Sequence, residues 1–301
     1  MFDINTKDYT TIDKIEGELQ SVDISENGKF IIATVYKNKT VWLRLVSGNK
    51  YKKIKFDEPK WVMKYMCISK DGQNTLNWSD KGLLEYYNIE EKIKISDIHN
   101  TNNQISSIHY SPNMKFIACG SYDCTVNIWN LNKLNQKICF KGHSNWVRVV
   151  SFSFDHKYIA SASDDKTIKV WNLQTKTEEF TLSGHSDWIR TIAFSVDRVF
   201  LASGSDDCSI KIWNLETKSE EFSFEGLSDR VSFVKFSSNR KALVSGLVNG
   251  TLLNWDLEKK KVSFMVSEEI NFWNVGFSRT GNYFACRVPG GFVKIWKVGC
   301  S

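Results

Sequence analysis

A histidine, a serine and an aspartate recur in this chain at a spacing that could assemble a hydrolytic triad. Ser161 and Asp165 follow His143 by 18 and 22 residues. In such a triad the imidazole accepts the serine proton, and the carboxylate orients the imidazole. The same set recurs 42 residues later at identical intervals, as His185, Ser203 and Asp207. Because a catalytic site would not be built twice in this way, we interpret these residues as structural.

Both sets lie within a longer repeat that ends in a tryptophan. Residues 140–173 align with residues 182–215 through Gly-His, two apolar runs, Asp-Asp and Trp-Asn. The tryptophan recurs every 42 residues at positions 129, 171, 213 and 255, and once more at 296. Upstream, Tyr87 and Trp42 take its place. The spacing therefore predicts seven repeats.

Each repeat has the pattern of short strands separated by turns. Apolar and polar residues alternate, as in 147–152 and 167–171. Turn-forming residues follow the first strand of several repeats, as in Lys70-Asp71-Gly72 and Ser111-Pro112-Asn113. No stretch has the pattern of a long amphipathic helix. The sequence thus predicts an all-β fold.

A period near 42 that ends in Trp-Asn or Trp-Asp resembles the WD-repeat family of β-propellers, in which each repeat supplies a four-stranded blade. The resemblance implies a seven-bladed propeller and a buried relay in each regular blade. In that relay the Trp indole bonds the Ser, the Ser bonds the His, and the His bonds the Asp. The residues that match are His143, Ser161, Asp165 and Trp171 in one blade, and His185, Ser203, Asp207 and Trp213 in the next.

The resemblance also implies that an N-terminal strand closes the ring. Five residues follow Trp296, which are too few for a fourth strand, whereas residues 9–15 could supply one. Such a strand would cover an otherwise exposed sheet edge. We expect a single domain over residues 1–301. The expected blades are 17–56, 60–99, 102–140, 144–182, 186–224, 228–266, and 269–301 plus 9–15.

Some repeats depart from the relay pattern. The third has Thr101 and Cys119 in place of His and Ser, and the sixth has Leu227 and Asn249 in place of His and Asp. Because a half-satisfied buried network is worse than none, we expect these repeats to have lost the relay as a unit.

Composition limits the classes of function. The chain has 301 residues, 42% of them hydrophobic, and its formal charge of +6 is too small for its length to indicate a nucleic-acid binder. No apolar run approaches membrane-spanning length, so we expect no membrane insertion. Seven cysteines without a Cys-x-x-Cys pair, with five histidines, indicate no zinc site and no cofactor. Reduced thiols favour a cytoplasmic location, or a nuclear one.

Candidate binding residues follow from aligning the repeats on the serine after the first strand. The resemblance implies that the position five residues earlier faces the mouth of the central channel, where peptides bind. Basic and aromatic residues gather at or near this position: Lys64, Trp146, Arg148, Trp188, Arg190, Arg230 and Trp273. Such residues predict a site for an acidic or phosphorylated segment. Alternatively, the tryptophans pack on neighbouring loops and the arginines are solvated.

The leading hypothesis is a non-enzymatic scaffold that binds other proteins, as a monomeric ring within a larger hetero-complex. An enzyme would need a cluster of catalytic residues outside the repeat pattern, and the sequence contains none. The alternative is a subunit that binds nucleic acid or a phosphorylated ligand through a basic mouth. Steep weakening of binding between about 50 and 200 mM salt would distinguish that alternative.

Overall fold

The structure is a computed structural model, and it is described over most of the chain. The described residues are 9–12, 18–25, 30–36, 40–45, 51–54, 63–69, 73–79, 83–88, 93–99, 105–237, 239–267, 275–277, 283–288 and 292–297. They contain strands and turns but no helix. Two compact units are present, Met1–Asn102 with Glu269–Ser301, and Asn103–Glu268.

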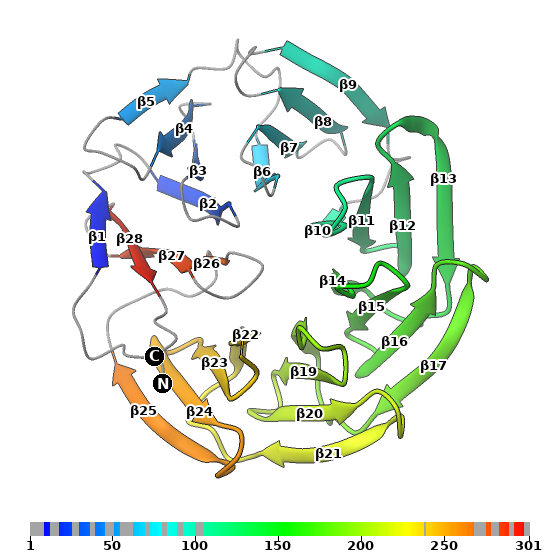
Figure 1. Cartoon of the computed structure of the whole chain (residues 1–301), viewed down its shortest axis with the longest axis vertical. Helices are drawn as coiled ribbons and strands as arrows, with labels where there is room; N and C mark the ends of the chain where they lie inside the picture. The colour runs from blue at the N-terminus through cyan, green and yellow to red at the C-terminus, as the bar shows by residue number, and fades with distance from the viewer. Residues whose placement is uncertain are drawn as a thin grey trace. The chain divides into compact units, whose positions relative to one another are not determined.

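The first unit contains three four-stranded antiparallel sheets among its described residues (Figure 1). Sheet 1 is β2 (Glu18–Ile24), β3 (Phe30–Tyr36), β4 (Thr40–Leu45) and β5 (Tyr51–Ile54). Sheet 2 is β6 (Met63–Ile68), β7 (Asn74–Ser79), β8 (Leu83–Asn88) and β9 (Ile93–His99). Sheet 7 is β26 (Val275–Phe277), β27 (Tyr283–Val288), β28 (Phe292–Lys297) and β1 (Tyr9–Ile12).

The second unit contains four such sheets, coloured green to orange in Figure 1. Sheet 3 is β10 (Ile105–Tyr110), β11 (Phe116–Ser121), β12 (Thr125–Asn130) and β13 (Lys133–Lys141). Sheet 4 is β14 (Val147–Phe152), β15 (Tyr158–Ser163), β16 (Thr167–Asn172) and β17 (Thr177–Ser183). Sheet 5 is β18 (Ile189–Phe194), β19 (Phe200–Ser205), β20 (Ile210–Asn214) and β21 (Ser219–Phe224). Sheet 6 is β22 (Val231–Phe236), β23 (Ala242–Leu247), β24 (Thr251–Asp256) and β25 (Lys261–Ser267).

The all-β prediction is therefore confirmed, and the antiparallel four-stranded sheets are consistent with a β-propeller. The repeating tryptophan lies in the third strand of its sheet, where it pairs with the second strand, as Trp171 does with Ile159. Sheet 1 departs from this register. There Arg44, and not Trp42, lies opposite Ile31 at the equivalent place, because the β3–β4 hairpin is one residue longer than the others.

Side chains close the turns that the sequence indicates. Between β14 and β15, Ser153 Oγ donates to Asp155 Oδ1 at 2.6 Å and accepts the N–H of Tyr158 at 3.0 Å. The same pair recurs in the other sheets of this unit, as Ser111–Asn113, Ser195–Asp197 and Ser237–Asn239. Between β16 and β17, Asn172 Oδ1 accepts two backbone N–H groups. The asparagine after the tryptophan thus forms the turn into the last strand.

The apolar core of the second unit lies between successive sheets. One cluster joins Ile168 and Val170 of sheet 4 to Ile189 and Trp213 of sheet 5. Small residues allow the sheets to approach, since a Cβ added at Gly204 would lie 2.3 Å from Val231 Cγ1. The first strands are also linked by polar contacts, as in the bond from Val150 N to Ser107 Oγ and that from Val234 N to Thr191 Oγ1.

The N-terminal strand joins the C-terminal sheet. β1 pairs antiparallel with β28, and Tyr9 lies opposite Trp296. The expected strand partner is therefore present within the first unit. The single domain over residues 1–301, its blade boundaries and the closure of a ring stay predictions.

Deleting residues 1–16 should lower the melting temperature by about 5–10 °C, because the exposed edge of β28 then loses its hydrogen-bonded partner. Thermal melts followed by circular dichroism measure this loss. Deleting residues 1–7 is the matched control, since it retains β1. Identical melting of the two truncated chains would contradict a stabilising role for this strand.

Candidate functional site

The repeated Ser-His-Asp-Trp sets form hydrogen-bonded relays in sheets 4 and 5. In sheet 4, Trp171 Nε1 donates to Ser161 Oγ at 2.8 Å. His143 lies between the serine and the aspartate, with Nε2 2.7 Å from Ser161 Oγ and Nδ1 2.8 Å from Asp165 Oδ2. Because the indole can only donate, the serine oxygen accepts from it, and the two imidazole nitrogens link the serine to the carboxylate.

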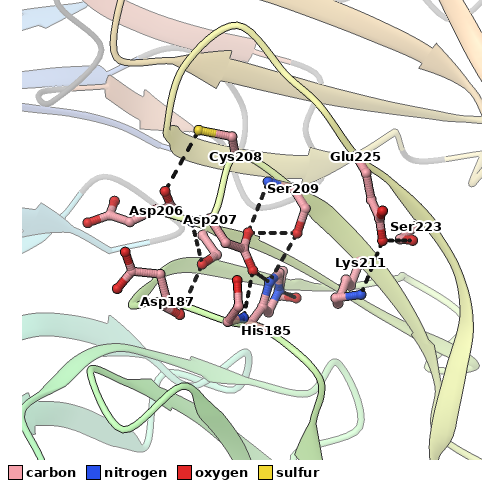
Figure 2. Close-up of polar contacts among 12 residues, drawn as sticks. His185, Asp187, Asp206, Asp207, Cys208, Ser209, Lys211, Ser223 and Glu225 are labelled. Atoms are coloured by element: carbon pink, nitrogen blue, oxygen red, sulfur yellow. Dashed lines mark hydrogen bonds and ion pairs between the residues drawn. The ribbon is translucent and has the colours of Figure 1, made fainter.

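The second relay has the same geometry. Trp213 Nε1 donates to Ser203 Oγ at 2.8 Å, and His185 lies 2.7 Å from both Ser203 Oγ and Asp207 Oδ2. Figure 2 shows Asp207 between His185 and Ser209, whose hydroxyl donates to Asp207 Oδ1 at 2.7 Å. The relay thereby joins the loop before β18 to the turn between β19 and β20.

The environment of each relay aspartate favours its charged form. Burial alone would raise the pKa of Asp165, but hydrogen bonds from His143, Thr167 and the N–H of Ser144 outweigh it. The pKa of Asp165 therefore lies well below its usual range. Asp207 behaves in the same way, through His185, Ser209 and the N–H of Ser186.

These sets are not arranged for hydrolysis. The side chains of Ser161 and Ser203 are fully buried, with 0% relative exposure, so that no substrate carbonyl could reach either hydroxyl. Each hydroxyl also accepts an indole N–H, which a nucleophile would have to release. Among the described residues, no group of His, Cys, Asp and Glu is placed to hold a metal ion.

Sheet 6 retains part of the relay, so the expectation that such repeats lose it as a unit is wrong there. Trp255 Nε1 donates to Ser245 Oγ at 2.8 Å. Leu227 packs against the apolar core where the histidine would lie. Asn249 Nδ2 instead bonds Ser228 Oγ at 3.0 Å, which again joins the loop to the turn. The Trp–Ser half of the relay persists because Leu227, unlike a histidine, has no polar group that needs a hydrogen-bond partner.

The positions expected at the channel mouth coincide with β-bulges. Arg148 lies at the register shift between Val147 and Val149, and Arg190 at that between Ile189 and Thr191. The equivalent residues of sheets 1, 2, 3 and 6 also lie at register shifts, and they are Gln20, Lys64, Ser106 and Ser232. A bulge leaves one residue out of the ladder and redirects its side chain. The alignment of the repeats thus located the β-bulge positions, although the sequence did not predict the bulges themselves.

Neither arginine is solvated or unpaired, which contradicts the alternative in which the arginines are solvated. Arg148 Nε and Nη2 bond the two carboxylate oxygens of Asp164 at 2.7 and 2.6 Å. Arg190 engages Asp206 in the same bidentate way, at 3.0 and 2.6 Å. The Asp164 side chain is 2% exposed, and its hydrogen bond raises the pKa of Arg148. Each arginine is therefore part of the folded framework.

Aromatic rings and guanidinium groups alternate across three sheets in what we call the aromatic–guanidinium row. Trp146 meets Tyr122 edge to face, with ring centroids 4.7 Å apart. The Arg148 guanidinium lies 5.0 Å from the Trp146 ring and 5.2 Å from the Trp188 ring. The Arg190 guanidinium lies 5.0 Å from the Trp188 ring. Trp146 and Trp188 remain 45% and 39% exposed.

The other predicted site residues lie apart from this row or outside the described residues. Arg230 is exposed and lies 3.8 Å from Asp229. Lys64 is in β6, but its side chain lies outside the described residues, as does Trp273. Sequence reasoning missed Tyr122, Asp164 and Asp206. The Asp-Asp doublet was the available signal, because the relay uses only its second residue.

A hollow of about 270 Å³ lies between sheets 4 and 5, at the opposite end of the strands. Its floor includes Val170 and Phe194, and its rim includes Arg198, which bonds Asp155 of the preceding sheet at 2.5 Å. This charged pair links one sheet to the next.

Comparison with known families identifies the repeats. The model of the WD domain, G-beta repeat, matches residues 91–130, 134–172 and 176–214. These three stretches are WD repeats. Each WD repeat spans the last strand of one sheet and the first three strands of the next, so the repeat and the sheet are offset by one strand.

WD repeats typically form scaffolds for protein–protein interaction, and the proteins that carry them are generally not enzymes. No curated protein matched the chain. A search of the described residues for helices found none that is long and apolar enough to cross a membrane.

Replacing His185 with alanine should lower the free energy of unfolding by about 1–3 kcal/mol, because the buried hydroxyl and carboxylate lose their shared partner. Urea melts of the full chain measure this. His99→Ala is the control, since the repeat pattern places His99 outside any relay. Equal losses in the two variants would refute the assignment.

Arg148→Glu should destabilise the fold by about 2–4 kcal/mol, since it places a second carboxylate beside the buried Asp164. Lys176→Glu makes the same charge change at an exposed turn position and should cost much less. Both are compared by urea melts. An Arg148→Glu variant as stable as the wild-type chain would show that the ion pair is not structural.

Proposed function

We propose that this WD-repeat chain is a non-enzymatic scaffold that binds a partner protein through the aromatic–guanidinium row. The observation that carries this proposal is the exposure of Trp146 and Trp188 in a fixed setting. Large exposed aromatic side chains are costly to leave in water, and they are frequent anchors of interfaces. Here the guanidinium groups hold both indoles in place before any partner arrives, which reduces the entropy lost on binding.

The proposed architecture is a single seven-bladed propeller in which β1 completes the last blade. The seven-fold recurrence of the third-strand position and the β1–β28 pairing support it. In such a ring the bulge residues would surround the mouth of a central channel, and the row would occupy one sector of that face. We propose that the ring acts as a monomer within a hetero-complex.

We propose a cytoplasmic or nuclear location. It is supported by cysteines that remain thiols among the described residues, such as Cys119, Cys124, Cys139 and Cys208. Burial raises the pKa of the Cys119 thiol, which makes this group unreactive.

An acidic or phosphorylated partner loses support at this surface. That expectation relied on guanidinium groups that are free to bind a phosphate or carboxylate. The alternative of a nucleic-acid or phosphorylated-ligand site relied on the same groups. In Arg148 and Arg190 the Nε and Nη2 donors are already used by carboxylates. A phosphate would be left with the remaining Nη donors of each arginine, close to a carboxylate that repels it.

Replacing Trp146 and Trp188 with alanine should weaken the principal partner about 30-fold or more, since an anchoring tryptophan typically contributes at least about 2 kcal/mol. The partner is first identified by crosslinking to the full chain and mass spectrometry, and its affinity is then measured by titration. Val196→Ala is the control, because Val196 is also exposed but lies at the opposite end of the strands. A stable double variant with wild-type affinity would exclude the row as the binding surface.

A further inference from the structure

We infer that the partner presents a basic segment, whose lysine or arginine side chains lie beside Trp188. This inference rests on the proposed function of the row and concerns the chemistry of the partner alone. It reverses the charge that the sequence predicts for the ligand. The argument depends on which charges remain once those within the row are paired.

The row itself contributes no net charge. Each of its two guanidinium groups is bonded bidentately to one aspartate, Asp164 or Asp206. The positive groups therefore stiffen the surface and orient the indoles, but the field of each is opposed by a carboxylate a hydrogen bond away. Charges around the row decide which partner it favours.

Carboxylates outnumber cations on the Trp188 side of the row. At this end of sheets 5 and 6, Glu225 lies beside Lys211 and is set aside. Four other carboxylates and two cations remain in the loops, turns and bulge, namely Asp187, Asp206, Asp207 and Asp229 against Arg190 and Arg230. On the Trp146 side, Lys141 and Lys166 offset Asp123 and Asp165. The acidic half of the surface is thus centred on Trp188.

Two of these carboxylates are placed to meet a partner. Asp187 precedes Trp188 and accepts its backbone N–H at 2.8 Å, and within the described part of the chain it forms no ion pair. Figure 2 shows the carboxylates of Asp187 and Asp206 directed away from His185. Asp229 accepts the N–H of Arg230 at 2.7 Å, in the equivalent loop of the next sheet. Its carboxylate also lies 3.8 Å from Arg230 Nε, and both side chains stay partly exposed, at 28% and 46%.

The carboxylates of both loops also act on the thiol of Cys208, in the turn between β19 and β20. The pKa of Cys208 is raised by burial and then by Asp229, Asp207 and Asp206, and Arg230 opposes them weakly. Cys208 is also joined to the next loop, since its carbonyl accepts the N–H of Leu227 at 3.1 Å. Acidic groups of both sheet 5 and sheet 6 therefore contribute negative potential at the turn that contains Cys208.

This local charge contrasts with that of the whole chain, which is +6. A basic peptide is repelled by the chain overall, so its capture would report this acidic half and not general attraction. An exposed indole beside carboxylates suits a lysine or arginine side chain, whose methylene groups can contact the indole while its charged end approaches a carboxylate.

The test uses two fluorescein-labelled peptides of equal length that share their leucines and glycines and differ in carrying lysines or glutamates. Fluorescence anisotropy with the full chain should show binding of the lysine peptide and much weaker binding of the glutamate peptide. The double variant Asp187→Asn, Asp229→Asn should bind the lysine peptide at least about threefold more weakly. Asp187→Lys with Asp229→Lys should reverse the preference. Glu216→Gln, an exposed change at the far end of sheet 5, is the control and should have no effect.

Each outcome bears on one of the two proposals. Preference for the glutamate peptide, lack of binding to the lysine peptide, or affinity unchanged by the aspartate variants would overturn the basic partner. If alanine at Trp146 and Trp188 still weakens the identified partner, the proposed function survives that result. If the tryptophan variant binds that partner normally, the proposed function fails whatever the charge preference.

Discussion

The structure depends on a buried serine hydroxyl that has to be fully hydrogen-bonded. In sheets 4 and 5 this hydroxyl, on Ser161 or Ser203, accepts the indole N–H from the third strand and bonds the histidine of the preceding loop. An unpaired hydroxyl at 0% exposure would be costly, so the loop, the turn and the strand are fixed together. The relay thus fixes the loop conformation far more tightly than the apolar core alone could.

Fixing that loop also positions the candidate site. The N–H of Asp164 bonds the carbonyl of Trp146, and the N–H of Asp206 bonds that of Trp188, so loop and turn run side by side. The bulged arginine of the same sheet then reaches the first aspartate of the doublet, while the histidine uses the second. One Asp-Asp doublet therefore serves two purposes, the internal relay and the external ion pair. The exposed indoles are held by the same bonds that stabilise the fold.

The aromatic–guanidinium row ends where the sheets lack the paired arginine and aspartate. Its two ends therefore differ in chemistry. Sheet 6 has Ser232 and Val248 at the places of the arginine and the aspartate, although Val248 N still bonds the carbonyl of Arg230. Sheet 3 has Ser106 and Tyr122, and Tyr122 packs on Trp146. Aromatic contact thus bounds the row on one side and carboxylates bound it on the other. A bound segment would meet an apolar end and an acidic end.

The sequence by itself determined the all-β fold, the turns and the relay residues, because these depend on local periodicity and on a repeat whose spacing can be counted. It located the bulge positions at Arg148 and Arg190, since an alignment of repeats preserves position. It did not show that both arginines are paired within the fold, because the partner of an arginine cannot be read from the sequence alone. Asp164 lies 16 residues from Arg148 in the chain, and only the pairing of β14 with β15 brings the two together. Tertiary structure therefore decided which charges are paired within the fold and which are not, since the charge at a surface depends on neighbours from other strands.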